Sequence, residues 1–312
     1  MDIKQLTYFC SVYELKNLSH AADASNVAQS AISHHISNLE SELGQSLFIR
    51  KPRGMEPTAA GVQLYAHAVK IIQATKQAER DMMQATKEVA GEFAIGLPFS
   101  VMKGIGLVLM ESIIRDFPKI RLTIVEGLSG ITHSNLLSAE VDLALFYNPQ
   151  IDRHIALEPV LEEEVLCVGK VSVIGPANQP ITFDELAKLP ILLLRHGASS
   201  RALIDRPGLL SKLMVNAPLQ LNSISGITNG MLAGLGCTIA PKIFVNEQLK
   251  SGELHCRPVV KPKLSRLLQI GHRSDYPSSP LFETVKKLIL DLIYTNVENG
   301  VWEANFLHRR KY

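Results

Sequence analysis

The stretch LSHAADASNVAQSAISHHISNLESELGQSLFIRKPRGMEPTAAG, residues 18–61, decides the fold of the first part of the chain. It opens with a short helical pattern whose small pair, Ala21 and Ala22, lets the next helix approach closely. The second helical pattern repeats apolar residues at intervals of four, three and four, at Ile32, Ile36, Leu39 and Leu43. We therefore expect one face of this second helix to be buried and its polar face to be free.

A basic turn follows the second helix, between Gln45 and Pro57. Pro52 and Gly54 supply the turn chemistry, and Arg50, Lys51 and Arg53 surround them. Helix, turn, helix and basic hairpin together form the layout of a winged helix-turn-helix, which reads bases in the major groove. On its own the hairpin would favour the alternative interpretation, a solvated charged turn.

Bulk charge does not support nucleic-acid binding. The net charge of the 312-residue chain is +2, and residues 1–58 hold five Lys or Arg against six Asp or Glu. The prediction of a DNA reader therefore depends on the spacing of the motif and on the three cations of the hairpin.

Residues flanking this stretch complete a domain that we expect to span 1–58. Residues 2–15 form a predicted helix with an apolar stripe at Leu6, Phe9, Val12 and Tyr13. Asn17 suits the N-cap position of the helix that begins at Leu18.

Residues 58–90 are almost free of Gly and Pro after Gly61, which predicts one long linker helix over 59–90. Steps of four and three give a heptad pattern at Leu64, Ala68, Ile71, Thr75, Ala78, Met82, Ala85 and Val89. We expect this stripe to pair with a second copy of the chain. The alternative is an amphipathic helix that packs on its own domain.

From Gly91 onward, short apolar strands alternate with helical patterns, which predicts an α/β module with a mostly parallel sheet and helices on both faces. We expect two lobes over 91–297: lobe I at 91–162 plus 270–297, and lobe II at 163–269. The tail, 298–312, is expected to fray or to pack on a neighbouring molecule.

The remaining bulk features argue against several classes of protein. Apolar runs are too short for a membrane helix. Met1 is followed by Asp2 and Lys4 without an apolar segment, so we expect no signal peptide and a cytoplasmic protein. The four cysteines form no C-x-x-C pair, and we expect reduced thiols rather than a redox switch.

The motif positions resemble those of the LysR-type transcriptional regulators. The resemblance rests on about twenty positions in residues 6–61, among them Leu18-Ser19, Ala21-Ala22, Gln29-Ser30-Ala31-Ile32-Ser33, Leu39-Glu40, Leu43-Gly44, Leu47-Phe48 and Ala60-Gly61. The order of linker helix and two-lobed module also fits, so the likeness covers nearly the whole chain. Within the family, the chain resembles regulators of nitrogen or aromatic metabolism.

The chain departs from the family pattern at a few positions. Ser30 stands where the family usually has Pro, Ala24 replaces a Leu, Pro57 replaces an apolar residue, and Ala28 replaces a capping Ser or Thr. These changes bear on sequence preference rather than on fold. The family's peroxide sensors carry a cysteine pair in lobe II, but residues 201–213 contain no cysteine here, which disfavours peroxide sensing.

The resemblance implies which residues contact promoter DNA. Gln29, Ser33 and His34 are the first candidates at the recognition-helix start, with Ser30 and His35 as second choices. Arg50 and Arg53 are the candidates in the wing. For the histidines, plain surface exposure is the alternative.

The two-lobed module resembles periplasmic-type (type 2) binding proteins, which hold ligands between lobes near strand ends and helix N-termini. Four loops carry the candidate effector residues: Ser100 and Val101; Ser129 and Gly130; Arg195, His196, Ser199 and Ser200; and Ser223 and Ser225. Hydroxyl groups, helix N-termini and nearby cations favour a small organic anion. Helix capping is the alternative role for each serine.

The resulting hypothesis is a ligand-responsive regulator and not an enzyme. We expect no metal and no cofactor, and we expect promoter DNA, a small effector, further copies of the chain up to a tetramer, and RNA polymerase as partners. No catalytic motif such as G-x-S-x-G or H-E-x-x-H occurs. The alternatives are an enzyme, or a solute-binding protein fused to a head domain.

Overall fold

The computed structural model describes residues 1–51, 54–83, 89–194 and 207–307. Its contacts divide the chain into two units, Met1–Glu88 and Val89–Tyr312. The first unit, called the head below, has its own apolar core, and the second unit has two larger cores and a smaller one.

Two capped helices open the head. In α1 (Ile3–Leu15), the Asp2 carboxylate accepts the backbone N–H of Gln5, and the Gln5 side chain accepts the N–H of Asp2. In α2 (Leu18–Ala24), the Asn17 side chain accepts the N–H groups of Ser19 and His20. The predicted N-cap at Asn17 is therefore confirmed.

The second helix of the motif is α3 (Gln29–Leu43), and it buries Ile32, Ile36 and Leu39 as predicted. The prediction for Leu43 is wrong, because its side chain is 40% exposed. Leu43 is the last residue of the helix, and Gly44 takes the left-handed conformation that turns the chain away from the core.

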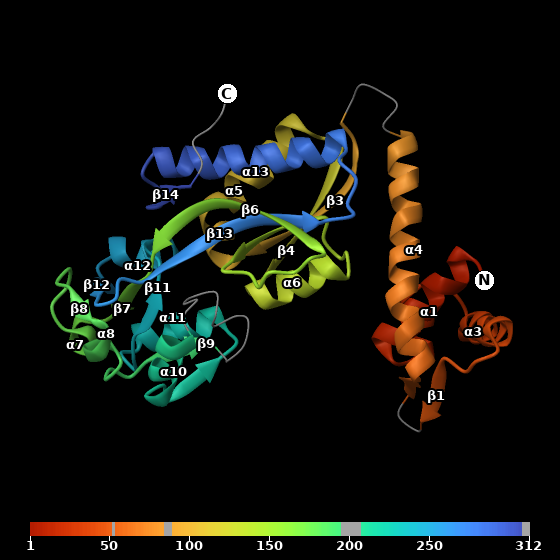
Figure 1. The fold of residues 1–312 in the computed structure, drawn as a ribbon, viewed down its shortest axis with the longest axis horizontal. Helices are drawn as coiled ribbons and strands as arrows, with labels where there is room; N and C mark the ends of the chain where they lie inside the picture. Colours follow the sequence, from red (N-terminus) through yellow and green to blue (C-terminus); the bar gives the residue numbers. More distant parts are fainter. Residues whose placement is uncertain (52–53, 84–88, 195–206, 308–312) are drawn as a thin grey trace. The chain divides into compact units, whose positions relative to one another are not determined.

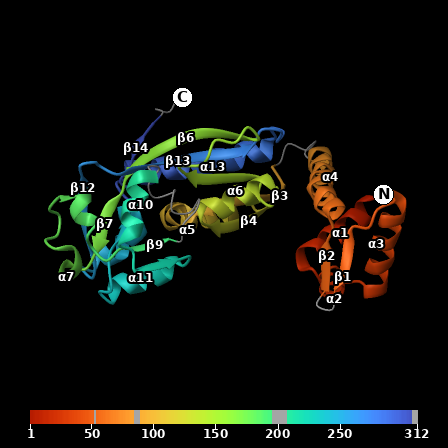
Figure 2. The same ribbon diagram turned by 60° about the horizontal axis from the view of Figure 1, so that its bottom comes forward.

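The wing is an antiparallel hairpin of β1 (Phe48–Lys51) and β2 (Gly54–Pro57), which lies beside the three helices (Figure 2). A carboxylate oxygen of Glu40 on α3 accepts the N–H groups of Leu47 and Phe48, which joins the wing to the helix. Gly54 has a φ of 134°, and a Cβ atom there would lie 2.3 Å from the carbonyl oxygen of Lys16. Only glycine fits this position without a shift of the backbone.

The linker helix is α4 (Ala59–Met83). Leu64 and Ala68 pack on the core of the head, so this part of the heptad stripe follows the alternative in which the helix packs on its own domain. Ile71 stays 37% exposed. The predicted end of the helix near residue 90 is wrong, since Val89 lies outside any helix and packs on a core of the second unit. Ala85 lies outside the described residues.

The second unit contains a six-stranded sheet with the strand order β14-β6-β13-β5-β3-β4 (Figure 1). Its strands are β3 (Gly91–Pro98), β4 (Ile120–Gly127), β5 (Leu143–Tyr147), β6 (Ile155–Glu164), β13 (Ser265–Arg273) and β14 (Asn305–Phe306). Strands β3, β4 and β5 are parallel, but the pairings of β13 with β5 and of β6 with β13 and β14 are antiparallel. The expectation of a mostly parallel sheet is therefore wrong, because β13 lies between β5 and β6 and runs antiparallel to both.

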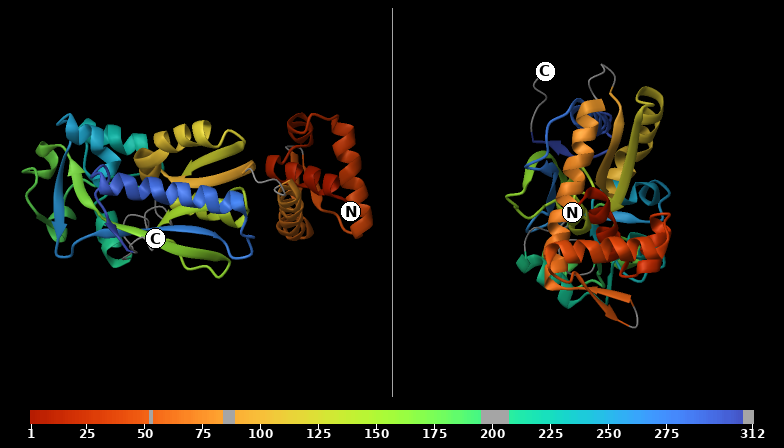
Figure 3. Two further views of the ribbon diagram at one scale, coloured as in Figure 1. Left: turned by 90° about the horizontal axis from the view of Figure 1, so that it is seen from above. Right: turned by 90° about the vertical axis from the view of Figure 1, so that its right-hand side faces the viewer.

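Helices cover both faces of this sheet. Helices α5 (Phe99–Asp116) and α13 (Pro280–Glu298) lie on one face, and α6 (Ser129–Leu137) lies on the other (Figure 1). Along β5, Leu143, Leu145 and Tyr147 join the core under α5 and α13, while Ala144 and Phe146 join the core under α6. Helix α13 runs along the sheet (Figure 3).

A smaller four-stranded sheet has the order β11-β7-β12-β8, and β9 pairs with β10 in parallel beside it. These strands are β7 (Leu166–Gly169), β8 (Ile181–Thr182), β9 (Leu192–Leu194), β10 (Leu219–Leu221), β11 (Thr238–Ala240) and β12 (His255–Val260). The helices around them are α7 (Val171–Ile174), α8 (Phe183–Leu186), α10 (Pro207–Val215), α11 (Ile224–Leu232), η1 (Lys242–Val245) and α12 (Asn246–Lys250). Strands β6 and β13 each run across one of the expected lobe boundaries, at 162/163 and 269/270.

The C-terminal segment corrects the expectation of a frayed tail. Trp302 is 1% exposed, and β14 pairs with β6 of the same chain. The indole ring fills a space in the core beneath α5, so residues 301–307 pack on their own unit. Residues 308–312 lie outside the described part.

Candidate functional site

The N-terminal turns of α3 present the polar surface that the sequence predicts. Gln29, Ser30 and His34 are exposed, and Ser33 and His35 are half-buried. Ala28 occupies the N-cap position and has no side chain to cap the helix. The first N–H groups of α3 therefore stay available to an acceptor such as a phosphate oxygen.

Neighbouring side chains orient three of these residues. Ser19 on α2 donates to the Gln29 side-chain carbonyl at 3.0 Å. The His34 ring lies 3.1 Å from the Asn38 amide, on the exposed side of the helix. The His35 ring packs against Tyr8 of α1, with 5.1 Å between ring centroids, so it is less free than His34.

The wing reaches the same surface through Arg50. Its guanidinium donates to the Ser33 hydroxyl at 3.3 Å, which brings together two candidates from separate parts of the motif. Lys51 instead forms an ion pair with Glu56 across the hairpin, at 3.3 Å. Arg53 lies outside the described residues.

A small pocket in the second unit includes two of the predicted effector residues. Ser129 and Gly130 at the start of α6 line it, together with residues that the sequence did not single out: His133, Tyr147, Asn148, Pro149 and Gln150. Its volume is about 60 Å³. The pocket lies at the carboxyl end of β5, where open α/β sheets bind their ligands.

Some polar groups of the pocket residues make no hydrogen bond. No side chain caps α6, whose N-cap is Leu128. Among the described residues, the Tyr147 hydroxyl and His133 Nε2 are buried and accept or donate no hydrogen bond. Burial raises the pKa of Tyr147 well above its ordinary value, against the opposing effect of the Arg266 guanidinium, so the phenol stays neutral. None of the pocket residues is acidic.

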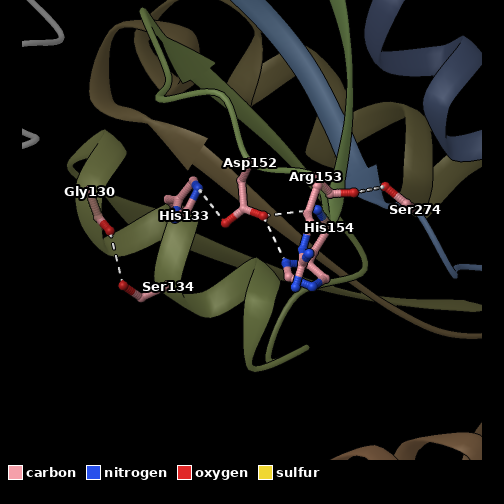
Figure 4. Close-up of polar contacts among 7 residues, drawn as sticks. All are labelled: Gly130, His133, Ser134, Asp152, Arg153, His154 and Ser274. Atoms are coloured by element: carbon pink, nitrogen blue, oxygen red, sulfur yellow. Dashed lines mark hydrogen bonds and ion pairs between the residues drawn. The ribbon is translucent and has the colours of Figure 1, made fainter.

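An acidic residue lies just beyond His133 (Figure 4). Asp152 Oδ2 is 4.0 Å from His133 Nε2, and Asp152 Oδ1 is 2.9 Å from His154 Nδ1. The backbone N–H of His154 is the main cause of a lowered Asp152 pKa, and the His154 ring adds to it.

Four of the other predicted effector residues, Ser100, Val101, Ser223 and Ser225, are not among the residues that line this pocket. Ser100 is 4% exposed and accepts a hydrogen bond from Arg266, and the Val101 side chain lies wholly in the apolar core. Ser223 caps α11 by accepting the N–H of Gly226, and its hydroxyl lies 3.1 Å from that of Ser225. The capping role considered for each serine therefore applies to Ser223. Arg195, His196, Ser199 and Ser200 lie outside the described residues.

Sequence reasoning missed His133 and Tyr147. The positions of both residues in the sequence could have indicated them. His133 lies one helical turn after Ser129. Tyr147 is the last residue of a fully buried strand, at the edge of the sheet where ligands bind. Within the part of the chain that the structure describes, no group of three His, Cys, Asp or Glu side chains is arranged to hold a metal ion.

Comparisons with known proteins identify the family. Residues 3–62 match the bacterial regulatory helix-turn-helix domain of the lysR family, and residues 86–293 match the LysR substrate binding domain. The chain belongs to the LysR family. It is a LysR-type transcriptional regulator with a DNA-binding domain and an effector-binding domain, and regulators of this family are not enzymes.

Relatives and solved structures extend along nearly the whole LysR-type chain. The nitrogen assimilation regulatory protein nac of Klebsiella aerogenes is 26% identical over 294 residues, which cover 94% of this chain and 95% of that protein. Full-length OxyR from Pseudomonas aeruginosa has a TM-score of 0.72 at 21% identity, with 99% of both chains covered. CbnR in complex with its target DNA has a TM-score of 0.64 at 17% identity, covering 94% of this chain and all of that one. At these identities the two structures show the fold alone.

Among the described residues of this LysR-type regulator, no helix combines the length and the apolarity that crossing a membrane requires.

Proposed function

We propose that this regulator binds promoter DNA as an oligomer and changes promoter occupancy when a small organic anion binds its second unit. The observation that carries the DNA half is the convergence of Arg50 with Ser33 on the exposed start of α3. A helix start in the major groove and a basic wing on the phosphates are the two contacts that a winged helix-turn-helix makes.

Within this proposal each head residue has a role. Gln29, Ser30, Ser33 and His34 face base edges, and His35 is secondary because Tyr8 covers part of its ring. Arg50 contacts phosphate while it holds Ser33 in place. Arg53, outside the described residues, is proposed as a further wing contact. DNA binding through these contacts and action in the cytoplasm are both parts of this proposal.

Pairing of two heads through α4 gives one protein two half-sites and doubles the phosphate contacts. Ile71 and Ala78 supply exposed positions of the heptad stripe that the head does not cover. A dimer of dimers and contact with RNA polymerase complete the proposed assembly.

The ligand half of the proposal depends on the pocket at Ser129 and Gly130. An uncapped helix start, a serine hydroxyl and the lack of a lining carboxylate suit an anionic group. About 60 Å³ accommodates a carboxylate head rather than a large molecule. The candidates Ser223 and Ser225, and those at residues 195–200, stay predictions that follow from the resemblance to two-lobed binding proteins.

The proposed output is a population shift. The ligand favours one arrangement of the two sheets of the second unit, which changes the geometry of the oligomer and the bend that it imposes on DNA.

A two-part experiment tests the proposed function. A thermal-shift screen of small carboxylates of nitrogen and aromatic metabolism, on the full chain, identifies a ligand, and a promoter fusion then measures its effect on transcription. We expect one ligand to raise the melting temperature and to change expression, with both effects lost in Ser129→Ala combined with His133→Ala. Catalytic turnover of the stabilising ligand would instead support the enzyme alternative.

A further inference from the structure

A buried ion pair lies beside the ligand pocket. Glu163 on β6 and Arg266 on β13 stand opposite each other across the strands, and they are 2% and 5% exposed. Nε and Nη2 of Arg266 lie 2.7 and 2.6 Å from the same oxygen, Glu163 Oε1. A pair buried this deeply is stable only when its other polar atoms also have partners.

Arg266 uses its remaining contacts on two groups at the ligand-binding edge of the sheet. Nη2 donates to the Ser100 hydroxyl at 2.8 Å. The guanidinium carbon lies 3.4 Å from the centroid of the Tyr147 ring, in a cation–π contact. Tyr147 is one of the residues that line the pocket, so Arg266 contacts a residue of its wall.

The second oxygen of Glu163 is occupied by a residue from the C-terminal segment. Nε1 of Trp302 donates to Glu163 Oε2 at 2.7 Å. The ring also lies against α5 at Gly104, where a Cβ atom would be 2.8 Å from the indole. Trp302 is thereby held from two sides, and it is the single tryptophan of the chain.

We propose that Trp302 is a positioning residue for the ligand pocket. Its N–H fixes Glu163, Glu163 fixes Arg266, and Arg266 holds Ser100 and the ring of Tyr147. The inference rests on the proposed ligand role of the pocket, and it gives residues 301–307 a role in regulation. Loss of the N–H leaves a buried carboxylate oxygen without its donor, so the whole chain of contacts must rearrange.

A purely structural role for Trp302 makes a different prediction. If the indole only fills space in the core, then Trp302→Phe keeps most of the stability of the core. The pocket residues are then unaffected by the substitution. If the N–H matters, phenylalanine fails although the core remains filled.

The first test uses the single tryptophan as a reporter. Full-length protein labelled with 5-fluorotryptophan has one ¹⁹F resonance. We expect Ser100→Ala to shift this resonance, because it removes an acceptor of Arg266 at the far end of the network. The matched control is Ser134→Ala, which removes an exposed hydroxyl of α6 outside the network. An unmoved resonance in Ser100→Ala, or equal shifts in both variants, would overturn the proposal.

The second test measures amide hydrogen exchange around the pocket. In Trp302→Phe we expect amide hydrogen exchange about threefold faster or more in peptides covering 128–137 and 143–150, with the head unchanged. Phe306→Leu is the control, since Phe306 belongs to the same segment but packs on Tyr294 instead of Glu163. Equal exchange in the two variants would contradict a role for the N–H. The fluorine measurement decides the matter if Trp302→Phe does not fold.

A titration with sodium acetate, matched with sodium chloride, separates this proposal from the ligand hypothesis. Acetate that binds wild type and shifts the Trp302 resonance supports both. A Ser100→Ala shift without any acetate binding keeps the positioning role and counts against the anionic ligand. Acetate binding that leaves the resonance unmoved counts against the positioning role alone.

Discussion

The guanidinium of Arg50, in the wing, donates to the hydroxyl of Ser33, on the recognition helix, across 17 residues of chain. This contact orients the wing cation toward the face of α3 that carries Gln29 and His34. It also explains how a head with a near-neutral charge can still present a cation at a defined place. Specificity and phosphate binding are thereby joined in one pair of side chains.

Replacement of Arg50 should weaken DNA binding without regard to sequence. We expect Arg50→Ala to lower affinity roughly equally for specific and unrelated fragments and to reduce the salt slope by about one for each head. Fluorescence anisotropy over a series of salt concentrations measures both. Lys51→Ala is the matched control, and its effect should be smaller because Glu56 already neutralises that lysine. Equal losses in the two variants would show that the contact with Ser33 has no special role.

Replacement of Ile71 should affect assembly. Ile71 is 37% exposed on the heptad stripe, whereas Val62, 51% exposed, lies on the opposite side of α4. We expect Ile71→Asp to convert oligomers to smaller species in sedimentation velocity, and Val62→Asp to leave their size unchanged. The reverse result would place the interface on the other face of the helix.

Replacement of Gly104 should destabilise the second unit. An added methyl group at this position would lie 2.8 Å from the Trp302 ring, inside a filled core. We expect Gly104→Ala to lower the free energy of unfolding by about 1–3 kcal/mol in urea titrations. Gly208, where an added Cβ meets no atom within 4 Å, provides the control. Wild-type stability in Gly104→Ala would mean that the indole is free to move.

Stability should fall at alkaline pH because buried thiols resist ionisation. Burial, with help from the nearby Glu14 carboxylate, raises the pKa of Cys10 from 9.0 to about 12. A thiol whose pKa is raised by folding stabilises the fold below its unfolded pKa, and this contribution is lost as the pH rises from about 9 toward 12. Urea unfolding between pH 7 and pH 10.5 should show a shallower loss in Cys10→Ala than in wild type. Equal slopes would contradict the assignment.

Local patterns allowed much of the head to be predicted. The Asn17 cap, the small pair at Ala21 and Ala22 and the apolar period of α3 act within a few residues, so their outcome depends little on distant parts of the chain. Leu43 failed because its burial depends on where the helix ends. The outcome for the linker helix was mixed, since a heptad stripe cannot show which of its residues the head will cover.

Distant contacts explain what could not be predicted in the second unit. Strand β6 contains Glu158, Pro159 and Glu162–Glu164, residue types that are uncommon in strands, so its sequence does not predict a strand. Val160 forms a β-bulge where β6 pairs with β13. The ion pair of Glu163 with Arg266 joins residues 103 positions apart, and its third member comes from the C-terminal segment. No local sequence pattern predicts such a network.

Binding of the full chain to the promoter region beside its own gene, measured over a series of salt concentrations, tests the central claim most directly. We predict a saturable complex with at least one upstream fragment, whose affinity falls linearly with the logarithm of salt concentration and drops in Arg50→Ala. The absence of any saturable, salt-dependent complex with every upstream fragment would contradict the account.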